Sequence, residues 1–211
     1  MGGGMSLPAR NRVTPTGEIV ASRLRGLFMG NRGCLHEGRE VVRRWRTRAW
    51  ITCATEFRGR RVQQWAPGRY TVLFFHDEAV ALAAGQRPCA ECRHPDHRRF
   101  LDAWEVVHGE RPRAPAVDAV LHAERLDGPT PQSRRRSWRD LPTGVFVVHD
   151  DEPALVLGDA VVPWSVDVGY QRPVARPLAG QATVLTPPST VEVVSAGYRP
   201  VIHPRAVELV A

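Results

Sequence analysis

The stretch "LAAGQRPCAECRHPDHRRF" at residues 82–100 contains a Cys-x-x-Cys pair, Cys89 and Cys92. Two thiolates at this spacing can point the same way after a tight turn. They then form half of a tetrahedral metal site, and the other ligands come from elsewhere in the chain. A thioredoxin-like redox pair would follow a strand and open a helix directly, whereas this pair follows a predicted helix end and a proline. We therefore predict a structural zinc ion as the cofactor at this pair.

Three residues earlier in the chain are candidates to complete the site, namely Cys34, His36 and Cys53. Cys53 lies on the strand-like run "WITCATEF", where a buried core thiol is the alternative role. Cys34 and His36 share a face if "GCLHE" is extended, so a four-coordinate site that includes Cys53 has room for only one of them. We predict His36 as the fourth ligand and keep Cys34 as the alternative, while His94 and His97 are less favoured.

The surrounding elements predict an α+β fold. Runs rich in β-branched and aromatic residues predict strands at residues 40–45, 49–57, 70–75, 144–149, 154–157, 160–164 and 182–185. Helices are predicted after the capping residue Asp77 up to Gly85, from Pro95 to Gly109, and over residues 116–126. Residues 128–142 are polar and indicate a linker.

An internal repeat suggests two related halves. Residues 71–88 align without a gap on residues 183–200, with seven of eighteen positions identical. His149 falls at nearly the position equivalent to His36, which is why His36 is preferred over Cys34. The alternative is chance similarity between two strand-helix units. We predict a zinc-binding half at 10–109, a helical connection and linker at 110–142, and a degenerate β-rich second copy without metal at 143–211.

The segment "YTVLFFHDEAVALAAGQRPCAECRHPD" resembles the end of the Ada-type zinc domain of bacterial methylphosphotriester-repair proteins. "RGLFMGNRGC" is similar to the segment that carries the first two zinc cysteines of that family. The resemblance covers about residues 24–98 and implies a zinc-stabilised fold that approaches DNA through its phosphates, in repair or regulation. The position nearest to the methyl-accepting cysteine is Met29, and a thioether cannot form a thiolate nucleophile. We therefore do not expect methyl transfer at this position.

Arginine supplies all 29 basic side chains, and their distribution is uneven. Residues 10–69 carry 14 Arg against 4 Glu, a balance of +10, whereas residues 140–211 carry 4 Arg against 8 acidic residues, a balance of −4. Arginines interleaved with tryptophans suit contact with phosphates and bases, although an ordinary solvated surface is the alternative. We predict contact with nucleic acid, DNA in the first place, or with another polyanion, through Arg32, Arg58, Arg60 and Arg61.

A second function remains open on the segment "DAVLHAERL". His122 and Glu124 are candidate acid/base residues, and Asp118 lies one helical turn before His122, where it can orient the imidazole. A solvated helix face is the alternative. With these residues the chain would be a metal-supported enzyme that acts on a small phosphorylated or anionic substrate, so the sequence leaves open whether it is an enzyme.

The composition and the motifs that are absent narrow the classes of protein to which this chain can belong. No run of eighteen apolar residues is present, and "MGGGMSLPAR" lacks the apolar stretch of a signal peptide. No phosphate-binding loop, Gly-x-Ser-x-Gly or dinucleotide-binding fingerprint occurs. We expect a cytoplasmic protein without a membrane span, whose four cysteines are reduced and available to metal.

Overall fold

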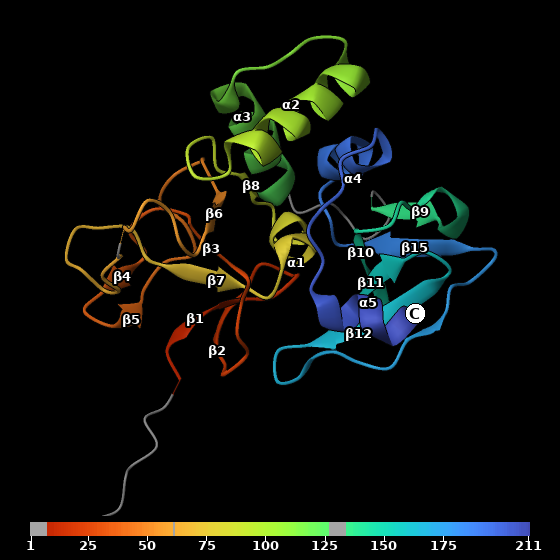
Figure 1. Cartoon of the computed structure of the whole chain (residues 1–211), viewed down its shortest axis with the longest axis horizontal. Helices are drawn as coiled ribbons and strands as arrows, with labels where there is room; N and C mark the ends of the chain where they lie inside the picture. The colour runs from red at the N-terminus through yellow and green to blue at the C-terminus, as the bar shows by residue number, and fades with distance from the viewer. Residues whose placement is uncertain (1–7, 61, 127–133) are drawn as a thin grey trace, which may run out of the picture.

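A computed structural model describes residues 8–60, 62–126 and 134–211 of the chain. It contains both helices and sheets, which confirms the α+β class. Figure 1 shows two main sheets on either side of helix α1 (Glu78–Ala83), with α2 (His94–His108) and α3 (Ala114–Leu126) at one end of the molecule. Within the described part of the chain, no helix combines the length and apolarity needed to cross a membrane.

The first sheet is built from the N-terminal segments and is mixed. Its six strands follow the order β2-β1-β7-β3-β6-β8, with β1 parallel to β7 and β6 parallel to β8. The strands are β1 (Arg10–Val13), β2 (Ile19–Ala21), β3 (Phe28–Asn31), β6 (Ile51–Ala54), β7 (Leu73–Phe75) and β8 (Arg87–Pro88). A separate hairpin is formed by β4 (His36–Glu37) and β5 (Glu40–Val41).

The second sheet is antiparallel throughout. Its order is β13-β12-β11-β10-β15-β9, and β14 pairs with β12. The strands are β9 (Arg135–Ser137), β10 (Phe146–His149), β11 (Glu152–Leu157), β12 (Ala160–Ser165), β13 (Gly169–Tyr170), β14 (Val174–Ala175) and β15 (Gln181–Val184). A 3-10 turn, η1 (Trp138–Asp140), follows β9.

The start of α1 and the end of α2 lie where local signals predict them. Asp77 caps α1 by accepting a hydrogen bond from the backbone of Val80 at 2.9 Å. Gly109, with φ 79°, ends α2 in the left-handed conformation that glycine adopts readily. The helices are α1 (Glu78–Ala83), α2 (His94–His108), α3 (Ala114–Leu126), α4 (Pro188–Ser195) and α5 (Pro204–Val210).

The hydrophobic cores join the two sheets. One cluster packs Phe100 and Trp104 of α2 with Val147 and Val156 of the second sheet. The other packs Phe75 of the first sheet with side chains of α1 and of β10, β11 and β12. Because both clusters cross the boundary between the predicted halves, the hydrophobic stabilisation of one half depends on the other.

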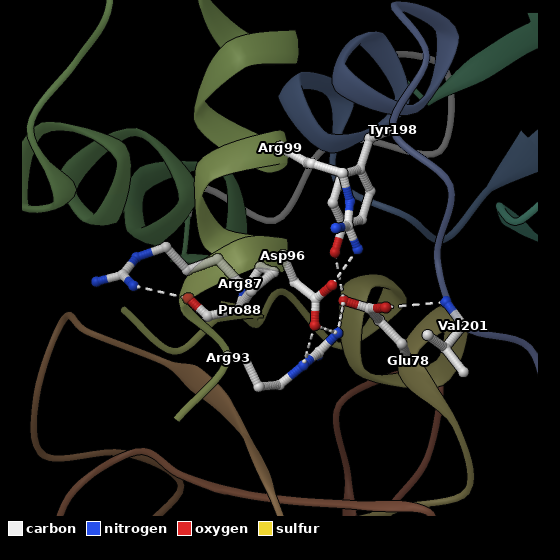
Figure 2. A network of polar contacts seen from close by, with 8 residues as sticks. All are labelled: Glu78, Arg87, Pro88, Arg93, Asp96, Arg99, Tyr198 and Val201. Carbon is white, nitrogen blue, oxygen red and sulfur yellow. Dashed lines mark hydrogen bonds and ion pairs between the residues drawn. The ribbon is translucent and has the colours of Figure 1, made fainter. Parts of the chain in front are cut away.

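A buried carboxylate on α1 connects three segments that are distant in sequence, as Figure 2 shows. Glu78 is 1% exposed and accepts hydrogen bonds from the Tyr198 hydroxyl at 2.6 Å and from the Val201 backbone at 2.9 Å. Arg93 forms an ion pair with the same carboxylate at 2.8 Å and another with Asp96. Burial lowers the pKa of Arg93, but the charge of Glu78 outweighs this effect and the pKa is raised.

The linker predicted at residues 128–142 contains regular structure in the part that the structure describes. Residues 127–133 lie outside the described part of the chain, whereas Arg135–Ser137 forms strand β9 beside β15. Trp138 follows it and is buried in the core. The arginine-rich composition of this segment hides an edge strand, because its guanidinium groups can remain exposed while the backbone pairs.

The structure matches the internal repeat only within the two aligned segments. Residues 71–88 and 183–200 each contain a strand followed by a helix, β7 and α1 in one and β15 and α4 in the other. The surrounding sheets differ, since β7 lies between β1 and β3 in a mixed sheet and β15 lies between β10 and β9 in an antiparallel one. A duplication of the whole half therefore stays a prediction.

The Glu78 contacts lead to a first prediction. Glu78→Gln should lower the free energy of unfolding by about 3–5 kcal/mol, because it leaves the buried Arg93 with only the less buried Asp96 as a counter-charge. Tyr198→Phe should cost about 1.5–3 kcal/mol, the usual range for a hydrogen bond to a charged group. Asp102→Asn, which breaks an exposed ion pair with Arg111, should cost less than about 1 kcal/mol. Urea unfolding of the three variants measures these values, and equal losses at Glu78 and Asp102 would contradict the assignment.

A second prediction concerns pH. The His76 ring stacks on His203 at 4.4 Å and accepts a hydrogen bond from the Trp164 indole at 3.0 Å. Burial, and then the charge of His203, lower the pKa of His76 to about 4. The unfolded chain takes up this proton below about pH 6.5, so the free energy of unfolding should fall as the pH decreases. Between pH 6.5 and 5 the loss should be at most about 2 kcal/mol, and His76→Asn should reduce it. An unchanged pH dependence in that variant would refute this role.

Candidate metal centre

Three of the four cysteines converge beside the edge of the first sheet. The Sγ atoms of Cys53, Cys89 and Cys92 all lie within 4.8 Å of one another, close enough to share one metal ion. Cys89 is buried, while Cys53 and Cys92 are partly buried. The structure therefore brings the predicted Cys-x-x-Cys pair together with one of its predicted partners.

Strand pairing explains why residues far apart in sequence meet here. Cys53 lies on β6, and β8 runs parallel to β6 immediately before Cys89. The Cys89 backbone N–H donates to the carbonyl of Thr52 at 2.9 Å, which continues the pairing by one residue. The chain then turns, with the Arg93 N–H donating to the Cys89 carbonyl at 3.2 Å, so Cys92 faces back toward its partners.

The thiols of the cluster influence one another strongly. A hydrogen bond from Cys53, together with backbone N–H groups of Cys92 and Glu91, lowers the pKa of Cys89 against the opposing effect of burial. The same hydrogen bond, followed by burial, raises the pKa of Cys53. Burial, and then the charge of Cys89, raise that of Cys92. Metal ligands must be deprotonated, so a cation bound here would displace protons from the thiols.

A cavity of about 200 Å³ adjoins the cysteines. Met29, opposite Cys53 on the neighbouring strand, lines it together with Asn31, Tyr70 and Arg60. Burial, and then the charges of the three cysteines, raise the pKa of Tyr70. The sequence points to Met29 and Arg60, whereas no motif points to Asn31 or Tyr70, which come from a strand and a loop.

The donor set determines the chemistry that this centre can support. Three thiolates are soft ligands that suit Zn²⁺, Cu⁺ or iron–sulfur chemistry rather than Mg²⁺ or Ca²⁺. Three protein ligands leave one position of a tetrahedral ion free for water or another molecule. The adjoining cavity provides room on one side of the cluster.

The predicted fourth ligand requires a correction. His36 is not part of the cluster: its Nδ1 shares a 2.7 Å hydrogen bond with the Thr71 hydroxyl, and its ring packs edge-on against Trp65. The Cys34 thiol, the alternative, contacts the carbonyl of His36 at 3.8 Å. The reason is that β4 pairs with β5 in a hairpin of its own instead of extending beside β6. Over residues 8–60, 62–126 and 134–211 the ligand group consists of three cysteines.

The two histidines behind the cysteine pair also stay outside this group. His94 is exposed, and its Nδ1 lies 3.1 Å from the carbonyl of Ala90. His97 is buried on α2, where burial, and then the charge of Arg87, lower its pKa.

The predicted nucleic-acid contacts fall into three groups. Arg58 and Arg60 are exposed near the metal centre, with Arg60 paired to Glu91 at 2.8 Å. Arg61 lies outside the described residues. Arg32 is 1% exposed, stacks on Trp50 at 3.9 Å and donates to the Gly17 carbonyl at 2.8 Å. Arg32 therefore cannot reach a phosphate backbone, which corrects that part of the prediction.

The candidate acid/base residues make other contacts. Glu124 accepts hydrogen bonds from the hydroxyl and backbone N–H of Ser189, at 2.6 and 3.0 Å, at the start of α4. His122 is buried edge-on against Trp45, with ring centroids 4.6 Å apart. Asp118 forms a bidentate ion pair with Arg87, so both of its carboxylate oxygens are bound to Arg87. These contacts favour structural roles for all three residues.

The cysteine geometry generates a third prediction. Cys53→Ser, Cys89→Ser and Cys92→Ser should each abolish stoichiometric metal binding and lower the melting temperature, because metal binding is coupled to folding. Cys34→Ser is the matched control and should retain the metal. Elemental analysis and thermal unfolding of the purified variants measure both effects. Metal loss in the Cys34 variant, or retention in the Cys53 variant, would contradict the three-cysteine site.

Comparison with protein-family models, with curated proteins and with solved structures gives no match to this chain. The resemblance to Ada-type zinc domains thus rests on the sequence segments that suggested it, and it stays a prediction.

Proposed function

We propose that this chain is a cytoplasmic zinc-binding protein that contacts nucleic acid through arginines of its metal-carrying half. The observation that carries the nucleic-acid part is a concentration of exposed arginines without counter-charges on that half. The metal centre supports the same half structurally, because two of its cysteines follow the edge strand β8 and the third lies on β6.

Zinc is the metal that fits the three-cysteine group best. It forms tetrahedral thiolate sites without redox chemistry, and its affinity for sulfur and nitrogen ligands is high. One divalent ion bound to three thiolates leaves a net charge of −1, which the nearby guanidinium of Arg60 would partly offset. Elemental analysis of the wild-type protein should find zinc, and a stoichiometric iron or copper content would refute this assignment.

The exposed arginines of the first half are suited to binding a polyanion. In the half at residues 10–109, nine arginines are exposed and form no ion pair with any residue that the structure describes: Arg10, Arg25, Arg39, Arg44, Arg46, Arg48, Arg58, Arg69 and Arg98. Such side chains gain from releasing the counterions of a phosphate backbone. Trp45, partly exposed at 37%, stands among them and offers a surface for stacking.

DNA is the partner that we favour, in repair or regulation, because the Ada-type resemblance implies an approach to DNA phosphates. The competing role, an enzyme using His122 and Glu124, receives less support from the contacts of these residues. Glu124 is engaged at the start of α4, and His122 packs against Trp45.

The fourth prediction tests the phosphate contact. The double variants Arg58→Ala/Arg60→Ala and Arg46→Ala/Arg48→Ala should each weaken binding to duplex DNA. Each should also reduce the slope of log affinity against log salt concentration by up to about 1.8, at ~0.9 per lost phosphate contact. The loss should be similar for unrelated DNA sequences, because phosphates carry no sequence information.

Arg172→Ala/Arg205→Ala is the matched control, since both residues are exposed in the second half. Its affinity and salt slope should equal those of the wild type. Fluorescence anisotropy at several salt concentrations gives both quantities. If the first-half variants also keep the wild-type affinity and slope, the nucleic-acid proposal is refuted.

A further inference from the structure

A second polar site lies between the two sheets, away from the cysteines. It is a pocket of about 150 Å³ where the β1–β2 turn, the end of α1, the end of α3 and the segment between β15 and α4 meet. Its lining includes Arg44, Arg125 and Arg134 but no carboxylate. Three cationic side chains around a small pocket indicate an anionic ligand.

The guanidinium of Arg125 is held in place by an aromatic ring. The Arg125 guanidinium lies 4.2 Å from the ring centroid of Trp50, and the Arg32 guanidinium lies 3.9 Å from it. Arg32 donates a hydrogen bond to the Gly17 carbonyl at 2.8 Å. Such stacking fixes the plane of a guanidinium group and leaves its N–H edge available to a ligand.

Several of these N–H groups lack partners. The Nε and Nη2 atoms of Arg125 and the Nε atom of Arg134 are buried and have no hydrogen-bond partner among the described residues. The Arg125 Nη1 donates to the Arg48 carbonyl at 3.3 Å, and the two Nη atoms of Arg134 donate to the carbonyls of Leu185 and Glu124. Buried donors that remain unpaired in a protein are expected to meet a ligand or water.

The positive charges also repel one another. Burial lowers the pKa of Arg32 to about 9, and the charges of Arg125 and Arg44 act in the same direction. Burial likewise lowers the pKa of Arg125 to about 9, which Asp118 and Glu124 offset only in part. Asp118 pairs with Arg87, and the Oε1 atom of Glu124 accepts from Ser189, whereas its Oε2 atom is buried without a partner among the described residues. All these arginines remain cationic at neutral pH, so an anion in the pocket would relieve their repulsion.

We propose that this pocket binds a phosphate group. A tetrahedral phosphate offers several acceptor oxygens, and guanidinium groups pair with such oxygens through two parallel hydrogen bonds. The group can belong to free phosphate, to a small phosphorylated compound or to the end of a nucleic acid. The proposal is independent of the zinc centre, and of the exposed arginines proposed to bind duplex DNA it uses only Arg44.

The experiment uses inorganic phosphate as the probe, with the full-length wild-type protein. Phosphate should raise the melting temperature more than chloride at equal ionic strength, and calorimetric titration should give a one-to-one complex. Arg44→Gln should weaken phosphate binding by about tenfold or more, since a charge-assisted hydrogen bond is lost. Arg44 is exposed, so this variant should fold normally. Arg134→Gln should have a similar effect.

Arg98→Gln, which removes an exposed arginine on α2, is the control and should bind phosphate as the wild type does. The proposal is overturned if phosphate stabilises the wild type no more than chloride does, or if all three variants bind phosphate equally. A second arm identifies the source of the group by comparing short oligonucleotides with a 5′-phosphate or a 5′-hydroxyl. If the wild type prefers the 5′-phosphate oligonucleotide and Arg44→Gln removes this preference, the ligand is the end of a nucleic acid. If the wild type binds the two oligonucleotides equally, the ligand is free phosphate or a small phosphorylated compound.

Discussion

The buried carboxylate of Glu78 receives groups from two other segments, and their placement depends on it. Arg93 comes from the cysteine loop, Tyr198 follows α4, and Val201 lies further along the chain before α5. A charge in this position is costly unless all its partners are present. Helix α1, the cysteine loop at residues 89–93 and the segment at residues 198–201 must therefore reach their final positions together. Asp77, the preceding residue, extends this constraint through its 2.6 Å hydrogen bond with Tyr170.

This arrangement changes what the metal would stabilise. In a small independent zinc module, the binding energy of the metal stabilises only the module itself. Here Cys92 directly precedes Arg93, and Arg93 pairs with the carboxylate that binds the second half. The hydrophobic clusters also cross between the sheets. Ordering of the cysteine loop by a metal should thus be transmitted to the entire core, and the first half should not unfold separately from the second.

Local signals predict much of the fold, and long-range pairing accounts for what they miss. Asp77 and Gly109 mark helix ends because capping depends on a few neighbouring residues. Cys89 and Cys92 could be identified by spacing alone. Which of the predicted partners Cys53, His36 and Cys34 joins them depends on which strand lies beside β8, and the local sequence of each segment does not encode that neighbour. Periodicity also cannot show that a chain turns back at Gly38, which places His36 on a separate hairpin.

Net charge is a property of the sequence, but its effect depends on where each arginine lies. Arg32 contributes to the excess of positive charge in the first half, yet it is buried against Trp50 and cannot contact a distant partner. Exposed arginines are screened over a Debye length of about 8 Å at physiological ionic strength, whereas buried charges are screened much less. The arginines around Trp50 should therefore attract a small anion even in salt that suppresses binding of a polyanion to the surface. The two groups of arginines can thus act on different ligands under the same conditions.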